Sequence, residues 1–281
     1  MIKRRTFVKN MAAISALSLI SPSKILSMPQ TKQLIGIQLY TLRDLVNQDF
    51  TGTLTKLSQI GYNSIEAAGY NDEHFYGYKP TEYKNILTDL GLAPISSHCN
   101  INIDNAKKVA EDTLNAGMSY VILPWIGTDR RSSLDTYKAL AEEMNIIGEQ
   151  CNQLGLKFGY HNHAFEFETI DGQLPYDILL NETYADKVCM QLDLYWMVYG
   201  GYDPLEYFKK YPGRFELWHV KDMANDTKRE STEIGSGTLD FPAMFNNKSL
   251  SGMQYYFVEQ EAFTIDPMES VKMSFNYLKN I

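Results

Sequence analysis

Residues 153–163 read Gln-Leu-Gly-Leu-Lys-Phe-Gly-Tyr-His-Asn-His, which joins a helix end, a glycine, a short apolar run and two histidines. Glycine just past a helix end readily adopts the left-handed conformation that closes the helix, and the chain then enters a strand. The segment therefore predicts one helix-to-strand step, with polar side chains at the end of the strand.

The same pattern of a helix end, a glycine and a short apolar run occurs three more times, around Gly61, Gly91 and Gly117. Four repeats of helix, glycine and strand indicate a parallel sheet with helices outside it. The apolar runs before and after these repeats complete a set of eight predicted strands. These are Leu34–Leu39, Asn63–Ala67, Pro94–His98, Tyr120–Leu123, Lys157–His163, Val188–Leu194, Phe215–Val220 and Tyr255–Glu259.

Eight such units in 281 residues predict a closed (β/α)8 TIM barrel. Between the strands, Asn105–Asn115 and Ser132–Gln153 carry apolar residues at helical spacing. The alternative, an open doubly wound sheet, usually has a glycine-rich phosphate loop after its first strand, and none follows Leu39. No linker or low-complexity segment interrupts residues 31–281, so we expect them to form one domain.

The first thirty residues differ in character from the rest. A basic stretch, residues 3–9, contains the pair Arg4-Arg5 and precedes an apolar run from Met11 to Ile20. This pattern resembles a twin-arginine signal, and the run is too short to span a bilayer. We expect residues 1–30 to direct export to the periplasm, with processing near residues 27–30 and no membrane span in the mature chain. An ordinary N-terminal tail is the alternative.

The overall charge excludes one class of partner. The chain carries a net charge of −8, and five of its basic residues and no acidic ones lie within residues 1–30. The remainder is therefore more acidic still, and an acidic surface disfavours binding to a phosphate backbone. We expect no nucleic-acid partner. The three cysteines form no framework and are expected to be small buried apolar residues.

Polar clusters end the last four predicted strands, where the active site of a parallel barrel lies. Histidine and carboxylate side chains that converge there are suited to hold a divalent cation. The predicted ligands are His161, Asp193, His219 and Glu259. Two structural alternatives remain: Asp193 would cap the following turn, and Glu259 would form a buried salt bridge.

Other strand-end residues are candidates for substrate binding and proton transfer. We expect Glu66 and His98 to hold substrate hydroxyls, and Trp125 and Trp196 to offer apolar faces to a sugar ring or simply to pack. The catalytic candidates are His163 or Glu166 as the base, and Lys221, which would hold a sugar oxygen or form an outward salt bridge.

The ordered clusters resemble those of the xylose-isomerase-like TIM barrels, often called sugar phosphate isomerases/epimerases. The segments that carry the resemblance are Tyr160–Phe167, Gln191–Trp196, Gly200-Gly201, His219–Asp222, Gly235-Ser236-Gly237 and Val258–Glu261. By position, Asp193, His219 and Glu259 match ligands from strands six to eight. Relatives place a glutamate on strand five, where this chain has His161; either His161 replaces it or Glu166 reaches back to the metal.

The resemblance implies one divalent ion, Mn²⁺, Mg²⁺, Zn²⁺ or Co²⁺, and a small carbohydrate substrate. It implies a sugar isomerase or epimerase that acts through an enediolate on a sugar or keto-sugar. The alternative is a lyase or hydratase that cleaves an oxidised (3-keto) glycoside by elimination. A non-catalytic sugar-binding barrel is a third possibility. The sequence leaves the oligomeric state open.

Overall fold

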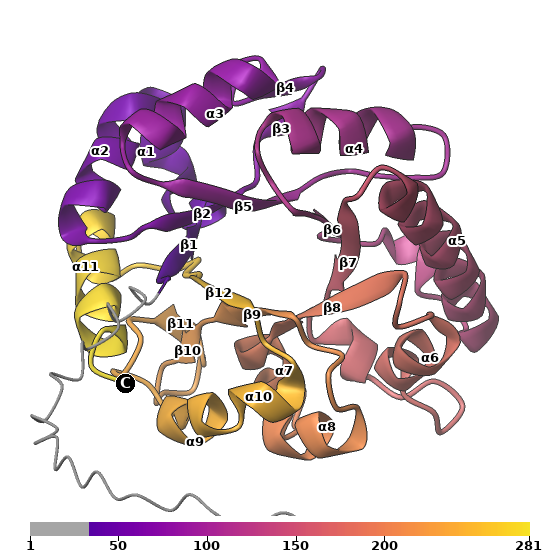
Figure 1. Ribbon diagram of the computed structural model, residues 1–281. Helices are drawn as coiled ribbons and strands as arrows, with labels where there is room; N and C mark the ends of the chain where they lie inside the picture. The colour runs from indigo at the N-terminus through magenta and orange to yellow at the C-terminus, as the bar shows by residue number, and fades with distance from the viewer. Residues whose placement is uncertain (1–33) are drawn as a thin grey trace, which may run out of the picture. The chain divides into compact units, whose positions relative to one another are not determined.

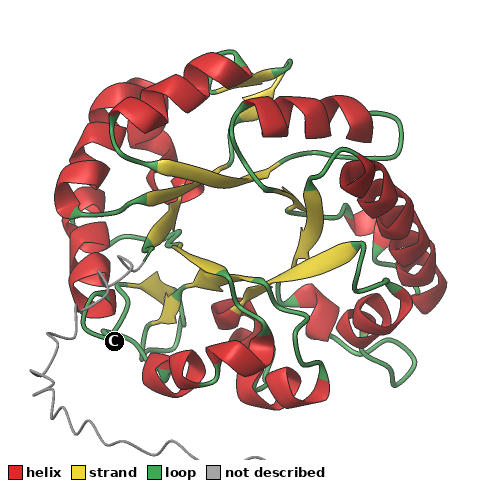
Figure 2. Ribbon diagram, viewed as in Figure 1, coloured by secondary structure: helices red, strands yellow, loops and turns green. Residues whose placement is uncertain are grey.

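The computed structural model describes residues 34–281, which form a barrel of eight parallel strands with helices around it (Figures 1 and 2). The strands close in the order β1-β12-β9-β8-β7-β6-β5-β2. Their bounds are β1 Gly36–Gln38, β2 Ser64–Ala67, β5 Ala93–His98, β6 Tyr120–Leu123, β7 Lys157–His161, β8 Val188–Asp193, β9 Leu217–Val220 and β12 Tyr255–Val258. All eight predicted strands are present, so the predicted (β/α)8 barrel is confirmed.

The helices lie outside the strand ring (Figure 2). They are α1 Arg43–Gln48, α2 Phe50–Ile60, α3 Pro80–Asp89, α4 Ala106–Asn115, α5 Leu134–Gln153, α6 Pro175–Glu182, α7 Leu194–Tyr199, α8 Pro204–Lys210, α9 Phe241–Asn246, α10 Lys248–Ser251 and α11 Pro267–Leu278. Short 3-10 turns occur at Leu39–Leu42, Thr128–Arg130 and Phe165–Phe167. The two helices predicted between strands correspond to α4 and α5.

Local chemistry explains how α5 begins and ends. The Ser133 side chain accepts a hydrogen bond from the backbone N–H of Thr136, which satisfies a donor that the first helical turn leaves free. Beyond the other end, Gly155 has φ 84°, a left-handed conformation that costs glycine little. The chain then enters β7, as the opening segment predicts.

The barrel interior is layered. The lower layer is apolar and contains Ile95, Ile122, Cys189, Leu217 and Phe257. Two residues further along several of the same strands the inward side chains become polar, because strand side chains alternate between faces. A larger apolar core lies between the strands and the helices. The three cysteines are buried and unpaired, in agreement with the prediction.

Several strands end earlier than predicted, at the edge where the polar residues gather. β7 stops at His161 rather than His163, and β12 stops at Val258 rather than Glu259. β8 stops at Asp193 because that residue also caps α7. Two short hairpins, β3 Tyr70–Asn71 with β4 His74–Phe75 and β10 Asp222–Met223 with β11 Ser231–Thr232, were not foreseen.

No helix within residues 34–281 is long and apolar enough to cross a bilayer. The predicted export segment, residues 1–30, lies outside the described residues.

Candidate metal centre and its pocket

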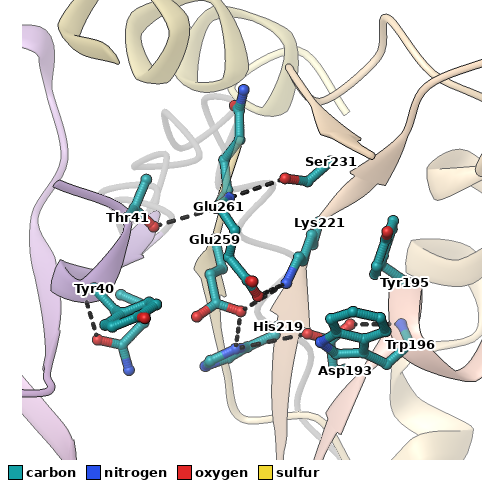
Figure 3. A network of polar contacts seen from close by, with 12 residues as sticks. Tyr40, Thr41, Asp193, Tyr195, Trp196, His219, Lys221, Ser231, Glu259 and Glu261 are labelled. Atoms are coloured by element: carbon teal, nitrogen blue, oxygen red, sulfur yellow. Dashed lines mark hydrogen bonds and ion pairs between the residues drawn. The ribbon is translucent and has the colours of Figure 1, made fainter. Parts of the chain in front are cut away.

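The four predicted metal ligands converge at one end of the barrel. One ligand atom from each of His161, Asp193, His219 and Glu259 lies within 4.8 Å of the others, and all four side chains are buried. They come from the ends of β7, β8, β9 and β12, which are neighbours in the sheet. Figure 3 shows three of these side chains, those of Asp193, His219 and Glu259, pointing toward one another. The geometry therefore fits a single ion held by two imidazoles and two carboxylates.

Asp193 supplies the test of whether the cluster suits a cation. Its Oδ1 accepts a hydrogen bond from the backbone N–H of Trp196 at 2.9 Å, so it caps α7 as the structural alternative proposed. Its Oδ2 is buried without any hydrogen-bond partner and lies 4.0 Å from both His161 Nε2 and His219 Nδ1. Burial raises the pKa of Asp193 to about 7 despite the nearby Lys221. A buried carboxylate oxygen left unpaired is costly, and a cation at this point would compensate it.

Hydrogen bonds on the far side of the two imidazoles set their tautomers. His219 Nε2–H donates to Glu66 Oε2 at 2.5 Å, which leaves Nδ1 facing Asp193 and Glu259. His161 Nδ1–H donates to Gln191 Oε1 at 3.1 Å, which leaves Nε2 facing Asp193. Carboxylate or amide partners behind ligating histidines orient the ring and raise its basicity. His161 Nε2 and His219 Nδ1 therefore both face Asp193, and a bound ion would replace the proton that His219 Nδ1 shares with Glu259 Oε2 at 3.1 Å.

Glu66, predicted to hold substrate, lies instead at the centre of this support. It is fully buried and is not among the residues that line the pocket. Besides His219, its carboxylate accepts hydrogen bonds from Gln38 Nε2 (2.8 Å), Ser96 Oγ (2.7 Å) and Gln191 Nε2 (2.6 Å). Burial opposes charge on His219, but Glu259 and Glu66 outweigh it and raise its pKa to about 10.

Lys221 is also placed behind the carboxylates. Its ammonium group is buried, forms an ion pair with Glu261 and lies 3.4 Å from Glu259 Oε2 (Figure 3). The ring of Trp196 lies 4.8 Å away. Burial disfavours the charge of Lys221, but Glu259, Asp193 and Glu261 together raise its pKa. Lys221 thus balances the negative charge of the cluster, and it does not line the pocket.

A pocket of about 830 Å³ opens over the cluster. Its wall includes four residues predicted from the sequence: His98, Trp125, His163 and Trp196. It also includes two predicted ligands, His161 and Glu259. The sequence analysis did not assign the remaining wall residues, which are Tyr40, Ala68, Tyr70, Asn100, Pro124, Ala164, Phe165, Glu168 and Glu261.

The two candidate bases occupy different positions. His163 lines the pocket, contacts Trp125 edge to face at 4.8 Å between ring centroids, and has a buried Nδ1 without a hydrogen-bond partner. Burial lowers its pKa to about 3, so the imidazole is neutral. Glu166 is fully buried, accepts hydrogen bonds from the Tyr160 hydroxyl and from the backbone N–H of His163 at 2.9 Å, and does not line the pocket. Burial raises the pKa of Glu166 to about 8.

Gln191 and Glu261 belong to the segments that carry the family resemblance, but the sequence analysis predicted no role for either residue. Gln191 accepts hydrogen bonds from His98 Nε2 (2.7 Å) and His161 while it donates to Glu66, so it joins three site residues. It stands two positions before Asp193 on the same strand, and the alternation of strand side chains could have identified it.

The sequence matches the family described as xylose isomerase-like TIM barrel over residues 54–281. It is 21% identical to an inosose dehydratase of Geobacillus kaustophilus, over 84% of this chain and 91% of that protein. Seven further matches to inosose dehydratases of Clostridium and Geobacillus species span about half of those proteins, 54%.

Solved structures share the fold. A sugar phosphate isomerase/epimerase from Parabacteroides distasonis is 29% identical, with a TM-score of 0.81 over 92% of this chain and 98% of that one. The IOLI protein with a bound zinc atom is 15% identical, with a TM-score of 0.71 over 88% of this chain and 97% of that one.

Proposed function

Since the chain belongs to the xylose isomerase-like TIM barrel family, we propose that it is a divalent-metal-dependent isomerase or epimerase of a sugar or keto-sugar. One observation carries the proposal. Four candidate ligand atoms converge beside a pocket that His161 and Glu259 line, and one of them, Asp193 Oδ2, is buried without a partner. The set of imidazole nitrogens and carboxylate oxygens suits Zn²⁺, Mn²⁺ or Co²⁺, with Mg²⁺ less favoured by two histidines.

An ion at this position would polarise a substrate carbonyl and acidify the adjacent C–H bond. The protein side chains would do the rest. His163 is neutral and lines the pocket, so its imidazole can accept the proton. Glu166 holds the backbone N–H of His163 and thereby its orientation. Glu261, on the wall that follows β12 and ion-paired with Lys221, offers a second carboxylate for proton transfer.

A second candidate is a lyase or hydratase that eliminates a substituent from an oxidised sugar, such as a 3-keto-glycoside. The match to an inosose dehydratase along 84% of the chain favours it. Both reactions begin with removal of the proton beside the carbonyl. They differ in the next step, in which either the proton returns or a group β to the carbonyl leaves.

Two measurements test the proposal. Elemental analysis of the purified protein should find about one divalent ion per chain, and a metal-free protein unresponsive to added Mn²⁺ would refute the metal site. The protein should then be incubated with free ketoses and 3-keto-glycosides in deuterated water and followed by NMR. Deuterium incorporation without loss of a substituent supports the isomerase or epimerase, whereas release of the aglycone supports the lyase.

We also propose that residues 1–30 direct export to the periplasm. The paired arginines and the short apolar run that follows them support this proposal. Cell fractionation of a reporter fused to residues 1–30 tests it, with a fusion in which Arg4 and Arg5 are both changed to lysine as the matched control. A reporter that stays in the cytoplasm in both cases would contradict it.

A further inference from the structure

The pocket wall carries three carboxylates, two of which pair with one buried lysine, Lys221, that does not itself line the pocket. Among its lining residues within the described chain are three glutamates, Glu168, Glu259 and Glu261, and no lysine or arginine. Proteins recognise phosphate groups with arginine or lysine side chains or with free backbone N–H groups. The proposed chemistry assigns the metal ion to the substrate carbonyl, so a phosphate group elsewhere on the sugar would need one of these sources.

The cations that contact residues of the pocket wall are engaged with protein groups. Lys221 is buried and paired with Glu259 and Glu261, and two arginines are engaged as well. Arg131 lies 3.9 Å from the ring of Trp125 and 3.4 Å from that of Phe165, and it donates two hydrogen bonds to the backbone carbonyl of Ile126. Arg43 donates to the carbonyl oxygens of Tyr40 and Glu261. Both side chains therefore brace the loops of the pocket wall.

The usual phosphate position of a TIM barrel is filled by the protein itself. In this fold phosphate is often held by the loops after the seventh and eighth strands, here β9 and β12. The loop after β9 contains Gly235 and Gly237, whose N–H groups both point at the buried carboxylate of Asp222, at 2.9 and 3.0 Å. The N–H groups of Met223 and Leu239 complete its shell at 2.8 and 3.1 Å. A side chain at Gly237 would collide with this carboxylate, at 2.3 Å from Oδ1, so the loop is built around Asp222.

The first backbone N–H groups after β12 are also engaged by side chains of the protein. The N–H of Gln260 donates to Thr41 Oγ1 at 3.2 Å, and the N–H of Ala262 donates to Ser231 Oγ. The N–H of Glu261 also donates to Ser231 Oγ (Figure 3). At the start of the following helix, α11, the Asp266 side chain accepts from the N–H groups of Met268 and Glu269. These backbone donors of the two loops are thus engaged within the protein.

From a pocket wall that has three carboxylates and no lysine or arginine, and from a glycine loop occupied by Asp222, we infer that the substrate is an uncharged carbohydrate without a phosphate group. This inference rests on the proposed function and narrows its substrate. Trp125, Phe165 and Trp196 offer apolar faces to a sugar ring. The volume of about 830 Å³ lies toward the upper end of ligand sites, which span roughly 300–1,000 Å³, so it leaves room for a substituent beyond one sugar ring.

The test compares matched pairs of substrates with the metal-loaded protein. Proton exchange in deuterated water is measured with free ketoses, with their phosphate monoesters and with uncharged keto-glycosides. Binding of the same compounds is measured by calorimetry, so that compounds that bind without exchanging are still compared. We expect the uncharged member of each pair to exchange and bind at least about tenfold better. A phosphate monoester that exchanges or binds better than its free sugar would overturn the inference while leaving the proposed function intact.

A charge variant tests the physical basis. Glu168 is an exposed pocket residue, so Glu168→Lys should raise the preference for the phosphorylated member of a pair by about tenfold. Glu142→Lys makes the same charge change on an exposed position of α5 that does not line this pocket and serves as the matched control. Equal effects of the two variants would overturn the inference, because the pocket wall would then not govern the choice. If no compound exchanges at all, the proposed function fails, and the binding data alone decide the preference for uncharged ligands.

Discussion

Replacing Glu66 by glutamine tests whether this residue orients His219 for metal binding through the hydrogen bond to its Nε2–H. Its Oε2 accepts the Nε2–H of His219 and so leaves His219 Nδ1 free to face Asp193 and Glu259. The amide of glutamine has one oxygen that accepts and one NH₂ group that donates. If the NH₂ group faces His219, the imidazole proton must move to Nδ1. If the oxygen faces His219, the NH₂ group faces Nε2 of Gln191, which is also a donor. Either arrangement disturbs the site without changing its size.

Two independent magnitudes agree on the expected loss. Removal of a carboxylate partner behind a ligating histidine typically weakens metal binding ten- to hundredfold, or about 1.4–2.7 kcal/mol. A hydrogen bond to a charged group is itself worth about 1.5–3 kcal/mol. The dissociation constant of the metal should therefore rise between ten- and hundredfold in Glu66→Gln.

Competition with a chelator of known affinity, at fixed pH, measures this constant. Ser96→Ala is the matched control, because it removes a neutral hydrogen bond of 2.7 Å from the same carboxylate and leaves His219 untouched. We expect Ser96→Ala to stay within about threefold of the parent protein, since a neutral hydrogen bond contributes only about 1 kcal/mol. Circular dichroism checks that both variants fold. Parent-like metal affinity in a folded Glu66→Gln protein would refute the positioning role.

Four further predictions follow from the site. Asp193→Asn should weaken metal binding by more than the ~100-fold upper range for an outer partner, with the fold intact by circular dichroism; unchanged affinity would exclude Asp193 as a ligand. Lys221→Met should cost the metal-free protein roughly 3–5 kcal/mol in urea unfolding, because Glu259 and Glu261 lose their buried counter-ion, and added metal should restore part of it. The raised pKa of Glu166, about 8 against 4.5, means that the folded protein retains a proton that the unfolded chain releases. The protonated Glu166 therefore adds to the free energy of unfolding below pH 4.5, and this stabilisation is lost as the pH rises to about 8. Urea unfolding across this pH range should show that the stability of Glu166→Gln falls with pH by up to roughly 5 kcal/mol less than that of the parent protein. Trp125→Ala should raise KM for the sugar about two- to tenfold with little change in kcat, since an aromatic contact contributes about 0.5–1.5 kcal/mol; an unchanged KM would assign Trp125 to packing alone.

The convergence of the four candidate ligands was predictable because it depends on two regular features. Parallel strands end at one edge, and strand side chains alternate, so His161, Asp193, His219 and Glu259 were expected to meet. The position of Gln191 beside these residues could have been predicted by the same alternation, since it lies two residues before Asp193. The N-terminal export segment stays a prediction, since it lies outside the described residues.

Depth in the barrel could not be read from the same pattern. Glu66, Lys221 and Glu166 were expected at the substrate, and each is buried behind a residue that lines the pocket or binds the ion. Alternation says that a side chain faces inward, but the height at which it meets side chains from other strands depends on the stagger of the closed barrel. The use of the glycine loop by Asp222 is likewise a consequence of tertiary contacts.

The sequence alone thus determines the order of helices and strands, because helix, glycine and strand repeat along it. It also determines which polar residues at the strand ends share a face, because strand side chains alternate with a period of two. The choice of partners is decided only when the barrel closes. His219 and Glu66 are 153 residues apart, and their hydrogen bond sets which imidazole nitrogen is free for an ion. A tautomer depends on the atom that stands opposite the ring, and only the folded structure brings that atom there.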